Sequence, residues 1–376
     1  MRTEVTINPN MISWAITRAG FDIQSFLENN PTIQQWIQEI KKPTVKQLES
    51  FANRVHIPFG YLFLPEPPLE KIPFPFFRTG TTNSEKVSLN IFDTIQILQR
   101  RQEWITEYLI DNEQDTLSYV GRFHITDKCE TIVSDIRNTL QLHPDWASQF
   151  ATVEETLNFI TQKIEEIGVF IVFNGVVENN TRRPISVDEC RGFVLVNNYA
   201  PFMFVNAADA KPAQLFTIVH ELAHVWLGES AGFDNQNLLP SSDPVEKLCD
   251  AIAAEFLVPA KSLLSLWKQK PSIDHAKRFF KVSIIVVARR ALDLGLITRG
   301  EFFTFYNGYI ASFNQKRENQ PSGGDFYATA RKRVSVSFAN YVYQAVNQNK
   351  LLHRDAYKIT GLKGDTFQKF VTQHLH

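Results

Sequence analysis

A short histidine and glutamate motif is the part of the sequence whose residue types most clearly carry chemistry. His220, Glu221 and His224 stand in the run HELAH, which is an HExxH pattern. On a helix, histidines four residues apart lie on one face, so both imidazoles can reach one tetrahedral zinc ion. Glu221 lies one residue further round and can reach a water at that ion without binding the metal. The motif predicts a zinc site with Glu221 as catalytic base.

The motif must be held by a helix, which we expect over residues 211–227. In a helical projection of this segment, the apolar residues fall on the side opposite the histidines, which indicates that the histidines face a cleft. The apolar residues are Leu215, Ile218, Val219, Leu222, Val225 and Trp226. A helix whose histidines are merely packed or exposed to solvent is the alternative.

A catalytic zinc also needs a third protein ligand and keeps one position for water. The acidic residues downstream of the motif are Glu229, Asp234, Asp243, Glu246 and Asp250. We choose Glu246, because it lies 22 residues after His224, which leaves room for a loop and a returning helix. That helix would be capped by Ser242 or Asp243. Glu246 and Asp250 are four residues apart and share a face, although alone they would be interpreted as surface acids.

Short apolar runs before the motif predict strands, and longer periodic segments predict helices. The expected strands are 168–173, 192–196 and 202–206, with a charged loop at 177–190. The expected helices outside the motif are 88–110 and 152–166, with mostly helices after residue 227. Residues 65–77 hold five prolines and predict an extended linker. The fold class is therefore α+β.

Composition narrows the functional class and the compartment. The chain has 376 residues, a formal net charge of -1 and 44% hydrophobic residues, so it does not read as a protein that binds polyanions over its whole surface. Its three cysteines are widely spaced and form no CxxC pair, which fits a reducing compartment. Residues 1–10 lack a signal-peptide pattern, and no apolar stretch reaches membrane-spanning length. We expect a cytoplasmic protein without a membrane partner.

Residues 1–66 predict four short helices with tight turns, as in a helix-turn-helix module. The segment has six basic and six acidic residues, whereas strong DNA binders are normally basic. The candidate contacts to base edges are Thr32, Gln34 and Gln35, and the candidate contacts to phosphates are Lys41, Lys42 and Lys46. A module that binds another protein fits the sequence equally well.

Residues 165–265 resemble the ImmA/IrrE family of bacterial metallopeptidases, whose pattern has two strands, an FTxxHExxH helix and then ExxxxxxAxxxLxP. The positions that match are Phe216, Thr217, His220, Glu221, His224, Glu246, Ala253, Leu257 and Pro259. The resemblance implies that Glu246 is the third metal ligand. In thermolysin-like zincins the same Glu-x-x-x-Asp spacing lets the aspartate hold a ligand histidine, a role that falls to Asp250 here.

The N-terminal residues, from WAITRAGF to HIPFGYLFLPEPP, resemble the Xre-type domain of longer family members. We therefore expect four parts. They are a helix-turn-helix-like domain at 1–66, a proline-rich linker and helical region at 67–150, a zincin-like core at 151–268 and a helical C-terminal region at 269–376.

The resemblance implies regulatory proteolysis. Family members cleave transcriptional repressors, and others are encoded beside toxin genes, including those of PIN-type ribonucleases, and look like antitoxins. We therefore expect a zinc endopeptidase with one zinc per chain that acts on a repressor or a toxin-system partner. The alternative is an antitoxin or transcriptional regulator that binds a toxin or operator DNA, with a peptidase fold that is slow or inactive.

Overall fold

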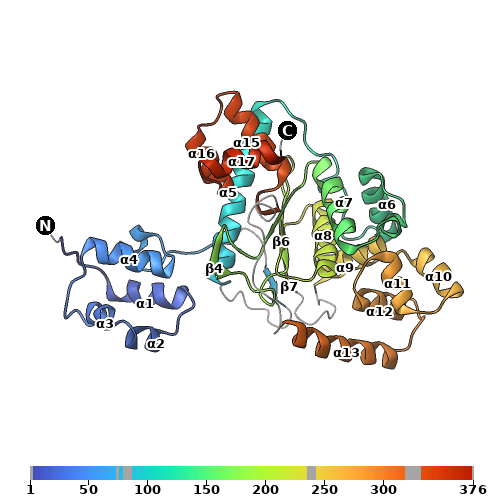
Figure 1. The fold of residues 1–376 in the computed structure, drawn as a ribbon, viewed down its shortest axis with the longest axis horizontal. Helices are drawn as coiled ribbons and strands as arrows, with labels where there is room; N and C mark the ends of the chain where they lie inside the picture. Colours follow the sequence, from blue (N-terminus) through green and yellow to red (C-terminus); the bar gives the residue numbers. More distant parts are fainter. Residues whose placement is uncertain (1–2, 73–75, 79–86, 235–242, 318–331, 375–376) are drawn as a thin grey trace. The chain divides into compact units, whose positions relative to one another are not determined.

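The computed structural model describes residues 3–72, 76–78, 87–234, 243–317 and 332–374 (Figure 1). The chain divides into two compact units. One consists of Met1–Pro73 with Ser84–Ile95, and we call it the N-terminal unit. The other consists of Phe74–Asn83 with Gln96–His376, and we call it the main unit.

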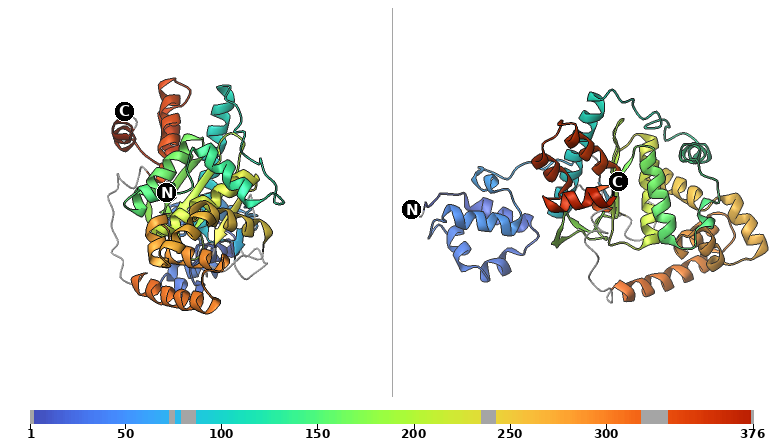
Figure 2. Two further views of the ribbon diagram at one scale, coloured as in Figure 1. Left: turned by 90° about the vertical axis from the view of Figure 1, so that its right-hand side faces the viewer. Right: turned by 45° about the horizontal axis from the view of Figure 1, so that its top comes forward.

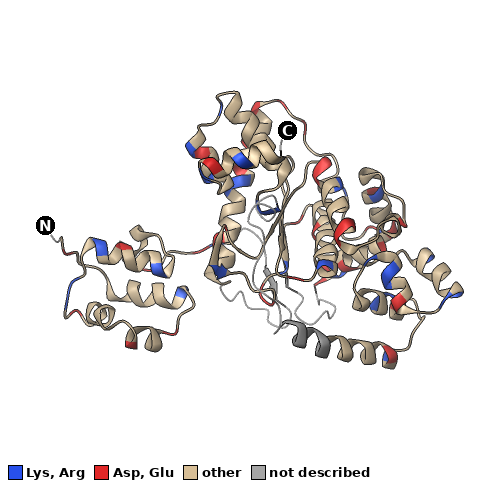
Figure 3. Cartoon of the chain, in the orientation of Figure 1, with Lys and Arg blue, Asp and Glu red and all other residues tan. Residues whose placement is uncertain are grey.

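The N-terminal unit contains four short helices, as the turn signals within residues 1–66 predict. Its elements are α1 (Pro9–Arg18), α2 (Ile23–Glu28), α3 (Pro31–Ile37), α4 (Val45–Val55) and a 3-10 turn, η1 (Phe59–Phe63). Thr44 and Gln47 form a capping box at the start of α4, and Trp36 and Phe51 pack edge to face with ring centroids 6.3 Å apart. Acidic and basic residues are interspersed along this part of the chain (Figure 3). The helices thus close around a small apolar core of their own.

Among the described residues of the main unit, five strands form one sheet in the order β1-β7-β5-β6-β2. They are β1 (Phe76–Arg78), β2 (Phe170–Asn174), β5 (Gly192–Leu195), β6 (Phe202–Asn206) and β7 (Ala231–Asp234). β2 runs parallel to β6, and β1 runs parallel to β7. β5 lies between β6 and β7 and is antiparallel to both.

The strands β2, β5 and β6 are buried along their whole length, so both faces of this part of the sheet must be covered. Ile171, Val194 and Met203 belong to the large core that also contains the HExxH helix. Phe170 and Phe202 pack instead against Phe338 of a C-terminal helix, with ring centroids 6.1 and 5.4 Å away. Side chains alternate along a strand, so β2 and β6 each contribute residues to the core around α8 on one face and to the contacts with Phe338 on the other.

Helices cover both faces of this sheet, as the views in Figures 1 and 2 agree. The helices before and around the motif are α5 (Leu89–Asp111), α6 (Cys129–Leu140), η2 (Trp146–Gln149), α7 (Val153–Glu166), α8 (Lys211–Leu227) and α9 (Pro244–Leu257). Those that follow are α10 (Ala260–Gln269), α11 (Ile273–Phe280), α12 (Ile284–Asp293), α13 (Arg299–Arg317), α15 (Val336–Asn347), α16 (His353–Thr360) and α17 (Asp365–His374). Within the described part of the chain, no helix is both long and apolar enough to cross a membrane.

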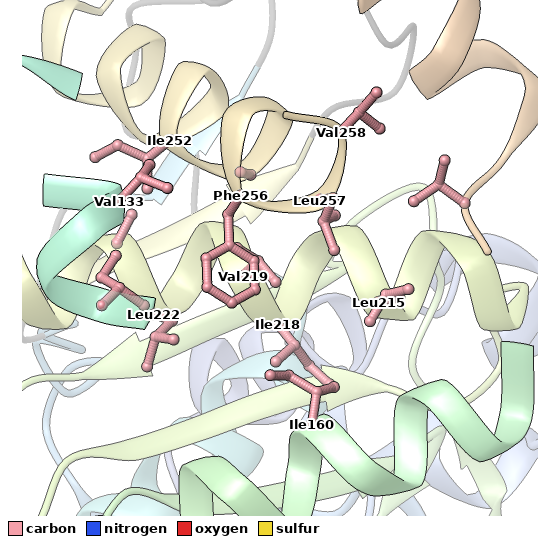
Figure 4. Packing of buried hydrophobic residues seen from close by; sticks show 14 of the residues in the cluster. Val133, Ile160, Leu215, Ile218, Val219, Leu222, Ile252, Phe256, Leu257 and Val258 are labelled. Atoms are coloured by element: carbon pink, nitrogen blue, oxygen red, sulfur yellow. The ribbon is translucent and has the colours of Figure 1, made fainter. Parts of the chain in front are cut away.

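The packing of α8 against α7 and α9 fixes the position of the motif (Figure 4). On α8, Ile218 and Leu222 are fully buried, and so are Ile252 and Phe256 on α9 and Ile160 on α7. Burying one such side chain stabilises the fold by about 1.5–3 kcal/mol before the entropy of ordering is counted. The interface therefore holds α9 firmly beside α8.

Three local predictions need correction. The segment 177–190, predicted as a loop, contains part of a hairpin of β3 (Val176–Val177) and β4 (Asn180–Pro184). The strands β7 and β1 were not predicted, β7 within a region expected to be helical and β1 within the linker. All of these strands are short, and β4 is mostly polar and exposed, so no period-two apolar pattern marks them.

A buried arginine ties α5 to the C-terminal helices. Arg101 donates to the carbonyl oxygens of Ile359, Thr360 and Arg333, at 2.9, 3.3 and 3.1 Å. Two of these acceptors lie in the last turn of α16, where helix carbonyls lack partners and a cation is favourable. Burial lowers the pKa of Arg101 to about 10, which still leaves the guanidinium charged at neutral pH.

We predict that Arg101→Met lowers the free energy of unfolding by about 3 kcal/mol, because the carbonyls lose charged donors and stay buried. The neighbouring exposed Arg100→Met serves as control and should cost less than about 0.5 kcal/mol. Urea unfolding gives the energies, and hydrogen exchange should increase first in residues 334–373. Equal stability of the two variants would contradict the role given to Arg101.

Candidate metal centre

Helix α8 carries the motif and is bounded by residues suited to its ends. Pro212 lies in the first turn, where a missing N–H costs nothing, and Gly228 ends the helix with a φ of 76°. The expected helix over residues 211–227 is thus confirmed.

The histidine face of α8 is covered by α9. His220 and Glu221 are 0% exposed and His224 is 1% exposed. The helical projection predicted that this face opens to a cleft, and that expectation is wrong in the described structure. A helical projection includes the residues of α8 alone, whereas the burial of its histidine face depends on α9, which packs across it.

The N-terminus of α9 brings the acidic residues to the histidines. Asp243 caps α9 by accepting from the backbone N–H groups of Val245 and Glu246, at 2.8 and 3.2 Å. Of the two caps considered, Asp243 is therefore the one used, while Ser242 lies outside the described residues. One turn into the helix, Glu246 is buried and points at the histidines.

Three ligand-type side chains meet at nearly equal distances. His220 Nε2 lies 3.1 Å from Glu246 Oε2 and 3.3 Å from His224 Nε2, and His224 Nε2 lies 3.3 Å from Glu246 Oε1. A tetrahedral ion with bonds of 2.0–2.1 Å separates its ligands by about 3.3 Å. These residues could therefore hold one metal ion, and the separations fit a centre with two imidazoles and one carboxylate.

Asp250 lies on the same face of α9, one turn after Glu246, and contacts the other side of one histidine. Its Oδ1 is 3.0 Å from His220 Nδ1. When Nδ1 donates its proton there, the lone pair of Nε2 points into the centre. His224 differs, because its Nδ1 has no hydrogen-bond partner among the residues that the structure describes.

The electrostatics of the cluster favour a positive charge at its centre. Burial lowers the pKa of His220, but hydrogen bonds to Asp250 and Glu246 outweigh it and raise that pKa to about 10. Burial raises the pKa of Glu246, but the two histidines outweigh it and lower the pKa to about 2. Without a metal, a proton on His220 supplies the positive charge. A divalent cation meets the same requirement.

Glu221 occupies a different position from the three ligand-type residues. Both of its carboxylate oxygens are buried and lack a hydrogen-bond partner in the described part of the chain. Burial raises its pKa well above the usual value for glutamate. A buried carboxylate without a partner is costly, so its retention beside the histidines is itself a sign of function.

The remaining acidic candidates are elsewhere. Glu229 is exposed just beyond the end of α8, and Asp243 is used as a helix cap. Nothing is described of the side chain of Asp234. Among the described residues, the group that could hold a metal is therefore His220, His224 and Glu246.

Sequence reasoning missed one residue at the site, Gly192 at the start of β5. A Cβ at this position would lie 2.4 Å from Thr217 Cγ2, 2.9 Å from the carbonyl oxygen of Phe204 and 3.3 Å from Glu221 Oε1. Only glycine lets the strand pass this close to α8. The signal was present, because glycine opening an apolar strand often marks a close approach of the backbone.

The candidate DNA contacts fall into two groups. Thr32, Lys41, Lys42 and Lys46 line a groove of about 1240 Å³ in the N-terminal unit, together with Arg54. Gln34 and Gln35 are exposed on α3 and do not line that groove. The groove thus gathers the lysines that the sequence assigned to phosphates.

Comparison with known families assigns one part of the main unit. Residues 164–292 match the family model of the IrrE N-terminal-like domain, Peptidase_M78. This part of the chain is an M78 domain of the ImmA/IrrE family. The resemblance read from the sequence is thereby confirmed for these residues, and the M78 match points to a metallopeptidase.

Two further results concern the rest of the chain. Residues 334–373, which include α15, α16 and most of α17, match a domain of unknown function, DUF8813. No curated protein matches the chain. The M78 match does not include residues 1–66, so the Xre-type helix-turn-helix stays a prediction.

Proposed function

We propose that this protein is a zinc-dependent endopeptidase of regulatory type, whose substrate is a repressor or a toxin-system partner. The observation that carries the proposal is the spacing of 3.1–3.3 Å among His220, His224 and Glu246. Two imidazoles and a glutamate are a ligand set of catalytic zinc peptidases that leaves a fourth position for water. The M78 match supports the same class.

Bound zinc would polarise the peptide carbonyl and make water a stronger nucleophile near neutral pH. Glu221 is the base in this proposal: it takes the proton of the attacking water and passes it to the leaving amine. Burial raises the pKa of Glu221, which makes its carboxylate a stronger base. Asp250 would orient His220 by accepting the proton of Nδ1, so that Nε2 is the nitrogen available to bind the ion.

The finer fold assignment belongs to the same proposal. The buried sheet over α8, with β5 antiparallel beside Glu221, supports a zincin-like core. We retain the four-part division, with this core at 151–268, a helix-turn-helix-like domain at 1–66, and helical regions at 67–150 and 269–376. The cytoplasm is the proposed compartment, and one zinc per chain is the proposed stoichiometry.

A second candidate function is an antitoxin or transcriptional regulator that keeps the fold but cleaves slowly or not at all. The groove lined by Lys41, Lys42 and Lys46 favours this candidate, because clustered lysines suit the phosphates of operator DNA. Thr32 also lines that groove, while Gln34 and Gln35 are exposed on α3, where they could contact base edges. In this case the main unit would bind a toxin.

We predict close to one zinc per chain in the purified protein. His220→Ala and His224→Ala should abolish tight binding, and Glu246→Ala should lower the affinity strongly. Asp250→Ala should weaken binding by roughly 10–100-fold, as for residues that hold a ligand. Glu229→Ala is the matched acidic control. Elemental analysis and competition with a chelator measure these effects, and full zinc in both histidine variants would refute the site.

We predict that Glu221→Gln retains zinc and the fold but loses cleavage, because glutamine cannot accept the proton. The substrate is sought among co-expressed products of neighbouring genes by gel and mass spectrometry. A regulatory peptidase loses its biological effect with Glu221→Gln, whereas a binding antitoxin still neutralises its partner. Cleavage at the wild-type rate by the zinc-loaded variant would exclude Glu221 as general base.

If the N-terminal unit reads DNA, Lys41→Glu with Lys42→Glu should weaken binding to all sequences alike. The slope of log affinity against log salt should fall by roughly 2, because two phosphate contacts are lost. Lys71→Glu is the control, since Lys71 is exposed in the same unit but lies outside the groove. Titrations at several salt concentrations decide the matter. If the protein binds DNA at low salt without any preference for sequence, the groove does not read an operator and is better interpreted as a surface that binds another protein.

A further inference from the structure

Strand β5 passes directly over the proposed catalytic base. The missing Cβ of Gly192 would point at Thr217 and Glu221, so this residue faces α8. The strand is held on one side by β6, with Phe193 opposite Phe204 and Val194 opposite Met203. Its other edge is therefore the part of the sheet that can present backbone hydrogen bonds beside Glu221.

The chain's own strand β7 pairs with that edge. Phe233 lies opposite Gly192, Gly232 opposite Phe193 and Ala231 opposite Val194. The pairing continues at Ser230, whose Oγ accepts from the backbone N–H of Val196 at 2.8 Å. Facing residues of antiparallel strands have Cα atoms about 4.5–5.5 Å apart. The backbone at Phe233 thus lies one strand spacing from Gly192, at which a Cβ would lie 3.3 Å from Glu221 Oε1.

A peptide substrate needs an extended backbone and partners for its N–H and C=O groups. Addition of a strand to an exposed sheet edge supplies both, and side-chain pockets then supply specificity. The edge of β5 is suited to this, because it brings the added strand close to Glu221. We propose that β7 occupies the strand position that a substrate requires, so that the peptidase is self-blocked until β7 leaves β5. This inference rests on the proposed peptidase function.

The structure makes β7 the exchangeable partner of β5. β7 is a short strand that begins three residues after Gly228 ends α8, and it shares three residue pairs with β5. Its outer neighbour is β1, which pairs with β7 and not with β5. β6, in contrast, is buried along its length and is anchored from both faces of the sheet. Loss of β7 would leave the β5–β6 ladder and the metal centre in place.

A substitution that unpairs β7 tests the proposal. Gly232→Pro removes a backbone N–H within a strand that is paired on both sides. With zinc bound, cleavage of fluorescein-labelled casein should rise about 10-fold or more, since a few backbone hydrogen bonds are lost. Phe77→Pro in β1 is the matched control and should change the rate less than about 2-fold. An unchanged rate for Gly232→Pro, with zinc and fold retained, would overturn the proposal.

A reversible disulfide between β5 and β7 tests the proposal independently if the proline variant does not fold. Val194→Cys with Ala231→Cys places two cysteines at facing positions, within the Cα separation that a disulfide needs. The oxidised protein should lose casein cleavage, and reduction with a phosphine should restore it in the same sample. Full activity of the oxidised form would contradict a required departure of β7.

Peptide binding separates this proposal from the peptidase function. The probe is a fluorescent peptide with the sequence of residues 229–236, ESAGFDNQ, added to variants that also carry Glu221→Gln. Fluorescence anisotropy should give at least about 10-fold tighter binding with Gly232→Pro than without it. Tighter binding, together with no cleavage of casein or of a co-expressed partner by any zinc-loaded protein that keeps Glu221, would support the strand exchange and refute the peptidase. Equal, weak binding to both proteins would refute the strand exchange.

Discussion

The arrangement of the main unit depends on one electrostatic constraint, which is the need for a cation among three buried acceptor groups. When His220 donates from Nδ1 to Asp250, its Nε2 presents a lone pair to a carboxylate oxygen of Glu246 at 3.1 Å. Two lone pairs at this distance repel each other unless a proton or a metal lies between them. A proton satisfies one pair of atoms, whereas an ion at the centre satisfies all three. Because the cluster is buried, this repulsion is weakly screened, and a proton or a metal ion between the atoms stabilises the packing of α8 against α9.

The same constraint explains why α8 is buried on every side. A water-filled cleft would screen the charges and weaken the preference for an ion. The sheet supplies one wall of the site, because Gly192 allows β5 to lie against Thr217 and Glu221. The other side of that sheet is sealed by Phe338 from α15, which packs on Phe170 and Phe202. Helix α15 therefore covers the face of β2 and β6 that is turned away from the large core around α8.

The chemistry of the candidate site could be predicted from sequence because it follows local periodicity. Residues four apart share a helix face, which places His220 with His224 and Glu246 with Asp250 whatever the rest of the fold does. The start of α9 was likewise predictable, because Asp243 satisfies amide groups only two and three residues away. The prediction failed where distant segments decide the outcome. The burial of the histidine face depends on α9, and the register of β7 on β5 depends on strands that are far apart in sequence.

The burial of Glu221 means that some element around it must move before a substrate can reach its carboxylate. Glu221, the proposed base, is 0% exposed and cannot meet water or a peptide bond while the surrounding elements stay closed. Helix α9 cannot be the part that moves, because it carries Glu246 and Asp250 and its apolar side is locked against α6 and α8. Strand β6 is fixed by packing on both faces. Strand β7 pairs with β5 beside Glu221, and it carries none of the three residues that could hold a metal. Among the described elements, the β7 side of β5 is therefore where we propose that a substrate reaches Glu221, at the cost of the pairing between those two strands.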